Sequence, residues 1–303
     1  MSILTGTASW TDPTLLACKR FYPPHARTAE ARLRYYATQF KLVEVDATYY
    51  RMPNGQTAHL WATRTPDDFV FHVKAFRLFT GHPAPRQALP MDIRRELADD
   101  SDGMSTDPMV FYHQLPAELR GELWRRFLIA LEPLRMTGKL AAVHFQFAPW
   151  VHRNAHGVAW LHECRRYMQE HLMAVEFRHR SWFETSAASA WTLALEREAG
   201  MVHTVVDAPQ GFDNTVPAVW ESTHPELAVL RLHGRNITTW NNASNASSSR
   251  FQYEYSPAEL AELAQRLKRL AQQVRQAHAV LNTNYQDQGM RNATGLAAAL
   301  GAH

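Results

Sequence analysis

The stretch MAVEFRHRSWF, residues 173–183, begins as an apolar run and then places Glu176 and Arg178 two positions apart. Alternate residues of a strand point to the same face, so the pattern predicts a carboxylate and a guanidinium side by side at the end of a buried strand. Burying such a pair is unfavourable unless other groups bind it. Two interpretations follow: an ion pair that only fixes packing, or one part of a larger binding site.

Composition limits the classes of protein to consider. The 303 residues are 46% hydrophobic and 20% charged, which predicts a chain that folds completely. A net charge of +3 without a dense basic run gives no support for nucleic-acid binding. No apolar segment of about 18 residues and no signal-peptide pattern occur, so we expect a cytoplasmic protein without membrane contact. Cys18 and Cys164 have no partner spacing that would predict a disulfide or zinc, and no pattern defines an oligomeric state.

Apolar runs alternate with helical patterns along the chain. We predict strands at 3–9, 41–45, 69–75, 140–147, within 173–183, and at 202–207, 228–233 and 279–284. Helices are predicted at 26–39, 56–64, 117–136, 156–170, 187–199, 256–276 and 288–300, with a weak helix or turn at 216–222. Ser256 and Glu259 have the spacing of a capping box. The Pro-, Asp- and Arg-rich stretch at about 77–116 is predicted to be an insertion after the third strand, with a lid as one interpretation.

Eight strands that alternate with helices predict an α/β fold with parallel pairing. Eight such units in about 300 residues match the size of a closed (β/α)8 TIM-type barrel, here a single domain over 1–303. The main alternative is an open doubly wound sheet. Neither G-x-G-x-x-G nor a P-loop follows a strand, which removes the usual nucleotide signatures of that alternative without excluding its topology.

In such a barrel the functional groups gather at the C-terminal ends of the strands. Every predicted strand ends in hydrogen-bonding side chains: Thr7 and Ser9; Glu44 and Asp46; His72 and Lys74; His144 and Gln146; Glu176 and Arg178; Asp207; Arg231 and His233; Asn282 and Asn284. Any one acid could simply neutralise a neighbouring base. The complete ring instead predicts a polar cavity for a hydroxyl-rich or anionic small molecule.

Roles within the ring follow from side-chain chemistry. Glu176 and Glu44 are predicted as general acid/base groups, and His233 as an aid to proton transfer, because Gly234 next to it would allow a ligand to approach closely. The predicted substrate-binding residues are Lys74, Gln146, Arg178, Asp207, Arg231, Asn282, Tyr49 and Trp182. Other histidines, among them His278, fall in or beside helical patterns and are interpreted as surface groups.

Three functions remain open from the residues alone. We favour an enzyme, a hydrolase or isomerase, that uses general acid/base chemistry on a small polar, sugar-like or phosphorylated substrate. A metal-dependent isomerase or phosphodiesterase is an alternative, with Mn, Zn or Mg among Glu44, Glu176, Asp207 and His233; no H-x-H or H-E-x-x-H spacing occurs, and no cofactor is predicted. The other alternative is a non-catalytic ligand-binding or scaffold protein.

Seven motifs follow one another along the chain: GTASW (6–10), FYPP (21–24), EVDATYY (44–50), FQFAP (145–149), VEFRHRSW (175–182), LRLHGRN (230–236) and NTNYQDQGMRNA (282–293). Together they resemble the domain-of-unknown-function 72 family, also called YecE-like proteins. The resemblance implies a TIM-like barrel and no assigned reaction, and it picks out the ring residues Glu44, Lys74, Gln146, Glu176, Arg178, Asp207, Arg231, His233 and Asn282. The chain departs from the family at Asp46, where Asn is typical, at 281–284, and in the Asn/Ser-rich segment after the seventh strand, which leaves the contacts from strands two, seven and eight open.

Overall fold

The computed structural model describes residues 2–99, 109–241 and 247–301. Within these residues, parallel strands close into a barrel in the order β1-β10-β9-β8-β7-β6-β3-β2. Pairing of the first strand with the last, from Ser2↔Gln276 to Thr7↔Leu281, closes the sheet. The predicted (β/α)8 barrel is therefore confirmed, and the open doubly wound sheet is excluded. The barrel strands are β1 (Ser2–Ala8), β2 (Leu42–Val45), β3 (Val70–Lys74), β6 (Leu140–Gln146), β7 (Met173–Glu176), β8 (Val202–Asp207), β9 (Leu227–Leu232) and β10 (Gln276–Leu281).

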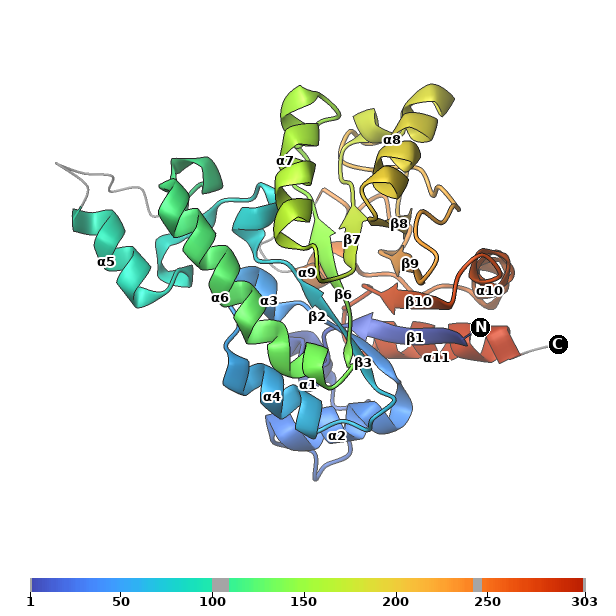
Figure 1. Cartoon of the computed structure of the whole chain (residues 1–303). Coiled ribbons are helices and arrows are strands. Elements are labelled where there is room, and N and C mark those ends of the chain that lie inside the picture. Colours follow the sequence, from blue (N-terminus) through green and yellow to red (C-terminus); the bar gives the residue numbers. More distant parts are fainter. Residues whose placement is uncertain (1, 100–108, 242–246, 302–303) are drawn as a thin grey trace.

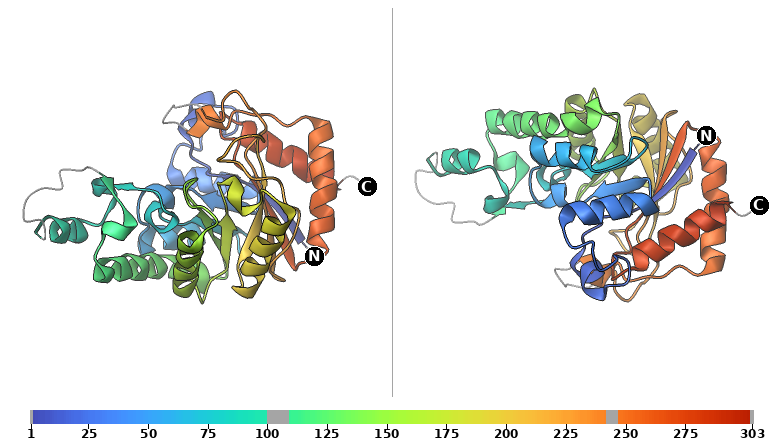
Figure 2. Two further views of the ribbon diagram at one scale, coloured as in Figure 1. Left: turned by 90° about the horizontal axis from the view of Figure 1, so that it is seen from above. Right: turned by 90° about the horizontal axis from the view of Figure 1, so that it is seen from below.

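Helices surround the strands on the outside of the barrel (Figures 1 and 2). The hydroxyl of Ser256 accepts a hydrogen bond from the Glu259 N–H, and the Glu259 carboxylate accepts one from the Ser256 N–H, which confirms the capping box. None of the helices in the described ranges has the length and apolar content needed to cross a membrane. The helices are α1 (Pro13–Cys18), α2 (Ala29–Gln39), α3 (Ala47–Tyr50), α4 (Gly55–Thr63), α6 (Ala117–Met136), α7 (Ala155–Tyr167), α8 (Ser186–Glu198), α9 (Ser247–Arg250), α10 (Pro257–Ala271), α11 (Gln288–Gly301) and the 3-10 turn η4 (Arg180–Trp182).

The segment between β3 and α6 leaves the barrel, as the predicted insertion requires. It contains η1 (Arg77–Thr80), β4 (Ala84–Pro85), η2 (Arg86–Ala88), α5 (Met91–Asp99), β5 (Met109–Val110) and η3 (Tyr112–Gln114), and β4 pairs with β5 in antiparallel fashion. Phe79 stacks on Trp124 of α6 with ring centroids 3.7 Å apart, which anchors the start of the insertion. Helix α5 lies at the edge of the molecule far from α10 in every view (Figures 1 and 2). Residues 100–108 of the predicted insertion lie outside the described residues.

Polar side chains fill much of the barrel interior alongside a small apolar layer. That layer comprises Ala142, Ala174, Val202, Leu227 and Val229. His72, which pairs with Ala142, and His278, which pairs with Val229, are both fully buried, and His72 Nε2 lies 2.9 Å from His278 Nδ1. The interpretation of His278 as a surface group is therefore wrong. Strand β10 begins at Gln276, three residues earlier than predicted, because the sequence pattern placed His278 in or beside the preceding helix, whereas this buried histidine lies within the strand.

Two predicted helices also need correction. The segment 216–222 forms neither a helix nor a turn. Pro217 removes one backbone donor there, and the segment instead covers β8, where Thr223 Oγ1 accepts a hydrogen bond from the His203 N–H at 2.8 Å. Helix α10 ends at Ala271 rather than at residue 276, because the following residues turn to lead into β10.

Candidate functional site

Arg231 connects two carboxylates inside the barrel, just below the C-terminal ends of the strands. Its Nε and Nη2 donate to both oxygens of Glu44, with Nε 3.0 Å from Oε2. Its Nη1 donates to Glu176 Oε2 at 2.9 Å and to Gln146 Oε1 at 3.0 Å. All three charged side chains are completely buried. The parity of strands β2, β7 and β9 thus brings together the groups that strand alternation predicted to meet.

Glu176 is surrounded by donors. Its Oε1 lies 2.8 Å from Arg178 Nη1 and 3.0 Å from His233 Nε2, and its Oε2 lies 3.3 Å from His144 Nε2 as well as close to Arg231. Burial alone would raise the pKa of Glu176, but the adjacent His233 and Arg231 hold it well below its usual range. Glu176 therefore stays ionised at neutral pH and is a poor proton donor. This geometry favours a positioning role, in which Glu176 fixes the two arginines.

His233 links the ion-pair layer to the last strand. Its Nε2–H points to Glu176, and its Nδ1 accepts a hydrogen bond from Asn282 Nδ2 at 2.8 Å. Burial lowers the pKa of His233 to about 3, which is consistent with this neutral tautomer. The space beside Gly234, at φ +82°, is filled by Tyr253 and is not open to a ligand, since an added Cβ would lie 2.3 Å from the Tyr253 Cβ. His233 is thus held by neighbours on both ring nitrogens.

A cavity of 360 Å³ opens at the C-terminal mouth of the barrel, above this buried layer. Among the residues predicted from sequence, Tyr49, Lys74, Gln146, Arg178 and Asn282 line it. They come from β3, β6 and the residues that follow β2, β7 and β10, so separate strand ends do converge on one space. The remaining lining residues are Asp46, Tyr50, His82, Pro149, Trp150, Asn214, Arg250 and Phe251.

Positive charge dominates this mouth cavity. Lys74 Nζ lies 3.3 Å from Asp46 Oδ1 and 4.8 Å from the centre of the Tyr49 ring. Within the described ranges, Arg250 forms no ion pair with a carboxylate. Burial and the charges of Lys74 and Arg77 lower the pKa of His82 to about 3. Burial and the neighbouring Arg178 also lower the pKa of Arg250. Both shifts arise first from burial, and the neighbouring cations add to them.

Asp46 is the only carboxylate among the described residues that line the mouth cavity. Burial would raise its pKa, but Lys74 and Arg231 outweigh burial and lower it, so the group is ionised at neutral pH. Its side chain is 20% exposed, although its Oδ1 is buried and lies 3.3 Å from Lys74 Nζ and 3.9 Å from Arg231 Nη2. Asp46 is therefore available to a ligand in a way that the fully buried Glu44 and Glu176 are not.

Three predicted binding residues, Asp207, Trp182 and Arg231, do not line the mouth cavity, and Arg231 is completely buried beneath it. Asp207 accepts hydrogen bonds from Arg235 Nη2 at 2.8 Å and from the Tyr255 hydroxyl at 2.6 Å, and it lines a different cavity. Trp182 is fully buried, donates from Nε1 to the Val151 carbonyl at 2.8 Å, and stacks on Phe177. Strand β7 ends at Glu176, and the turn that follows directs Trp182 into the core.

An aromatic rim on the cavity is formed by Tyr49, which was predicted from the sequence, and by Tyr50, His82 and Trp150, which were not. Ring centroids lie 5.4 Å apart for Tyr49 and His82 and 5.5 Å apart for His82 and Trp150. Tyr50 and Trp150 are 55% and 56% exposed, yet the Trp150 indole N–H donates to the Gly81 carbonyl at 2.9 Å and is held in place. The signal was present in FQFAP, because Trp150 follows a strand end and this motif directly.

The geometry gives no support to a metal centre on the predicted set. Arg231 lies between Glu44 and Glu176, and Asp207 is bound to Arg235 and faces elsewhere. In the part of the chain that the structure describes, no three His, Cys, Asp or Glu side chains are grouped so that they could hold a metal ion.

Comparisons with known proteins agree with the motifs. The model of a family described as "Protein of unknown function DUF72" matches residues 4–303. The UPF0759 protein YunF of Bacillus subtilis (strain 168) is 30% identical over 285 residues, which cover 93% of this chain and 89% of that protein. A crystal structure of a DUF72 family protein from Enterococcus faecalis V583 has a TM-score of 0.78 at 24% identity and covers 99% of this chain and 96% of its own. Another, from Thermotoga maritima MSB8, has a TM-score of 0.76 at 25% identity and covers 100% of both chains.

Proposed function

The chain belongs to the DUF72 family, and we propose that it binds a small sugar-like molecule that carries a phosphate or carboxylate group, at the C-terminal mouth of its barrel. One observation carries the proposal: Lys74, Arg178 and Arg250 face a cavity in which Asp46 is the only carboxylate among the described lining residues. An anionic group that entered would gain charge-assisted hydrogen bonds and relieve the repulsion between these cations.

The amides in the cavity have fixed orientations that suit hydroxyl groups. Gln146 Oε1 is bound by Arg231, which leaves the amide N–H groups of Gln146 to donate to a ligand. Asn282 Nδ2 is bound by His233, which leaves Asn282 Oδ1 to accept. One donor and one acceptor held in this way can distinguish hydroxyl positions on a ligand.

A ring fits the aromatic rim above these polar groups. The exposed faces of Tyr50 and Trp150 are apolar surface at the entrance of a charged cavity. A sugar ring combines an apolar face with hydroxyls at its edge, so it can pack on the indole while its anionic group reaches the cations.

For catalysis, the geometry supports Asp46 as the general base. It is ionised, it faces the cavity, and Lys74 beside it can stabilise developing negative charge on the substrate. Glu44 and Glu176 then act as positioning residues that hold Arg231 and Arg178. The resemblance to the family implies Asn at position 46 in typical members, so this role would be specific to chains that carry Asp there. If the wild type turns the ligand over and Asp46→Asn binds it without turnover, the protein is an enzyme with Asp46 as its base. If the wild type itself binds the ligand without turnover, it is a binding protein.

Ligand binding tests the proposal directly. We expect a phosphorylated sugar such as glucose 6-phosphate to raise the melting temperature of the wild type, whereas glucose does not. The variant Arg250→Gln should weaken the affinity about tenfold or more, because a hydrogen bond to a charged group contributes about 1.5–3 kcal/mol. Isothermal titration calorimetry on both proteins measures the change.

The matched control for Arg250→Gln is Arg275→Gln. Arg275 is 74% exposed in its side chain, pairs with Glu226 and precedes β10, at the opposite end of the barrel. It should leave the affinity unchanged. If no phosphorylated or carboxylated sugar stabilises the wild type, or if both variants bind equally well, the proposed anion site is wrong.

The aromatic rim leads to a separate prediction. Trp150→Ala should weaken binding of the sugar phosphate about threefold to tenfold, since a lost aromatic contact is worth about 0.5–1.5 kcal/mol, while binding of inorganic phosphate stays the same. Trp191→Ala is the control, because Trp191 is also exposed but does not line the cavity. Equal losses for both ligands would show that Trp150 only supports the structure of the mouth.

A further inference from the structure

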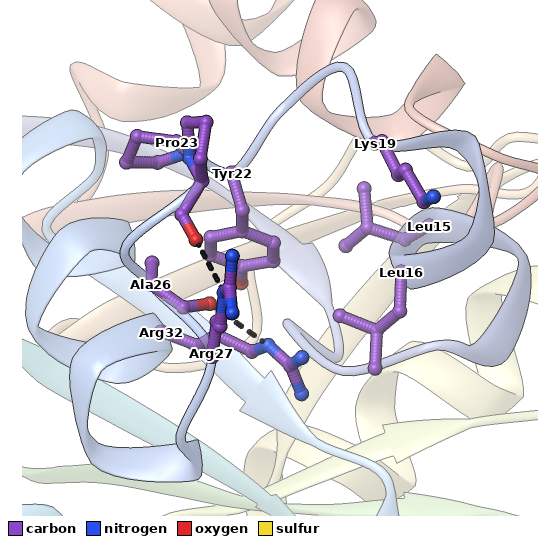
Figure 3. Close-up of a pocket in the computed structure, with 9 residues that line it drawn as sticks. Leu15, Leu16, Lys19, Tyr22, Pro23, Ala26, Arg27 and Arg32 are labelled. Carbon is purple, nitrogen blue, oxygen red and sulfur yellow. Dashed lines mark hydrogen bonds between the residues drawn. The ribbon is translucent and has the colours of Figure 1, made fainter.

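A second cavity, of 390 Å³, lies on the outside of the barrel between α1 and the segment that leads into α2 (Figure 3). Its wall includes Tyr22, Pro23 and Pro24 of the FYPP motif, which the mouth cavity does not use. The other lining residues are Leu15, Leu16, Lys19, Ala26, Arg27 and Arg32. The cavity therefore combines three cationic side chains with an apolar wall.

The two guanidinium groups are held in place by backbone carbonyls. Arg27 Nε donates to the Pro24 carbonyl at 2.9 Å, and Arg32 Nε donates to the Ala26 carbonyl at 3.2 Å. In Figure 3 the Arg27 guanidinium lies in front of the Tyr22 ring and that of Arg32 below it, with Lys19, Leu15 and Leu16 across from them. Fixing Nε leaves the terminal N–H groups of each arginine directed away from its own anchor, which is the preorganised arrangement that suits a carboxylate.

No acid of the described segments neutralises these cations. Within the described residues, none of Lys19, Arg27 and Arg32 forms an ion pair with a carboxylate. Glu30, the acid nearest to them in α2, is bound by Arg34 and Arg64 instead. An excess of uncompensated positive charge beside a cavity favours an anionic ligand.

The rest of the wall determines what kind of anion fits. Leu15 is buried and Leu16 is half-buried, and the Tyr22 hydroxyl donates to the Trp10 carbonyl, so this tyrosine presents its ring to the cavity. A bare inorganic anion would leave these apolar surfaces wet. A ligand with one charged end and a short apolar body would cover them, and the volume lies at the lower end of the range for small-molecule sites, about 300–1,000 Å³.

We propose that this outer cavity is a binding site for a small amphipathic carboxylate, such as a medium-chain fatty acid. The carboxylate lies between the guanidinium groups of Arg27 and Arg32, and the hydrocarbon chain packs on Leu15, Leu16 and the Tyr22 ring. Lys19 closes the cationic edge from the side of α1. The site is separate from the mouth cavity and depends on none of its residues.

Octanoate is the probe for this site. We expect octanoate to raise the melting temperature of the wild type and to give a measurable dissociation constant by calorimetry. Inorganic phosphate and octylamine, at the same concentration, should not bind at the outer cavity, because the first lacks an apolar body and the second lacks a negative charge. Arg27→Gln and Arg32→Gln should each weaken octanoate binding about tenfold or more, as expected for loss of a charge-assisted hydrogen bond. Arg27 is exposed, so its variant should fold normally.

Two further variants decide where octanoate binds. Arg34→Gln removes an exposed arginine from α2, the helix that contains Arg32, and Arg250→Gln removes a cation from the mouth cavity. Both variants should bind octanoate with an affinity within about twofold of that of the wild type. The proposal is overturned if octanoate does not bind, if Arg27→Gln and Arg32→Gln bind it as well as the wild type does, or if Arg250→Gln abolishes its binding.

Discussion

Replacing Arg231 with methionine is expected to lower the free energy of unfolding by about 3–5 kcal/mol, the usual loss when one member of a buried ion pair is removed. Glu44 and Glu176 would remain in the barrel interior, both completely buried, without the guanidinium that now donates to each. Methionine keeps much of the side-chain volume, so the loss would arise mainly from the unpaired charges. Urea denaturation at pH 7.5, followed by circular dichroism, measures the change.

A triple variant separates the effect of the two unpaired carboxylates from the effect of the cavity that the methionine side chain leaves. Adding Glu44→Gln and Glu176→Gln to Arg231→Met removes the uncompensated negative charges, so the triple variant should recover part of the lost stability. Arg275→Met, at an exposed site, should change stability by no more than about 0.5 kcal/mol. A near wild-type stability for Arg231→Met would mean that the two carboxylates take up protons or water instead of remaining charged.

The same ion pairs connect the fold to the proposed binding site. Glu176 accepts from Arg231 below and from Arg178 above, and Arg178 lines the mouth cavity. Arg178 also lies 4.9 Å from the centre of the Trp240 ring, on the loop after β9. An arginine held by both a buried carboxylate and an aromatic ring has little freedom to turn away, which preorganises it for a ligand.

Strand alternation explains why much of the buried layer could be predicted from the sequence. Once Glu44, Glu176 and Arg231 are assigned to strand ends of a barrel, their parity forces them into the same interior space, and the structure places them in direct contact. The same argument placed Lys74 and Gln146 correctly at the mouth. Periodicity was sufficient here because the backbone of a strand leaves only two directions for a side chain.

The rule fails where the chain leaves a strand. Trp182 follows β7 by several residues, and Asp207 meets Arg235 and Tyr255 from the loop after β9, contacts that no pattern within a strand reveals. His82 reaches the mouth from the insertion, and Arg250 reaches it from the end of the short helix α9. Loop directions depend on tertiary packing rather than on local periodicity, so residues farther from a strand end, such as His82 and Arg250, could not be assigned.

Lowering the pH from 7.5 to 5 is expected to reduce the free energy of unfolding by several kcal/mol, because histidines are buried in neutral form. Burial lowers the pKa of His233 to about 3 and that of His278 to about 4, and it holds the pKa of His72 well below its usual value. In the unfolded chain the same groups titrate near 6.5. Below this pH the unfolded chain binds protons that the folded chain does not, so each histidine costs about 1.4 kcal/mol per pH unit until its folded pKa is reached.

The cost is therefore absent above about pH 6.5 and grows as the pH falls toward 4. Glu176 and Asp46, whose pKa values are lowered in the fold, become protonated in the unfolded chain only near pH 4 to 5, so they add little between 6.5 and 5. His278→Asn tests the assignment, since an amide can replace the ring nitrogen that contacts His72 but does not titrate. The free energy of unfolding of His278→Asn should fall less steeply as the pH is lowered, by a slope that corresponds to about one proton fewer taken up on unfolding. The variant His59→Gln, at an exposed site, should have the same pH dependence as the wild type. An unchanged slope in His278→Asn would mean that the acid sensitivity has another source.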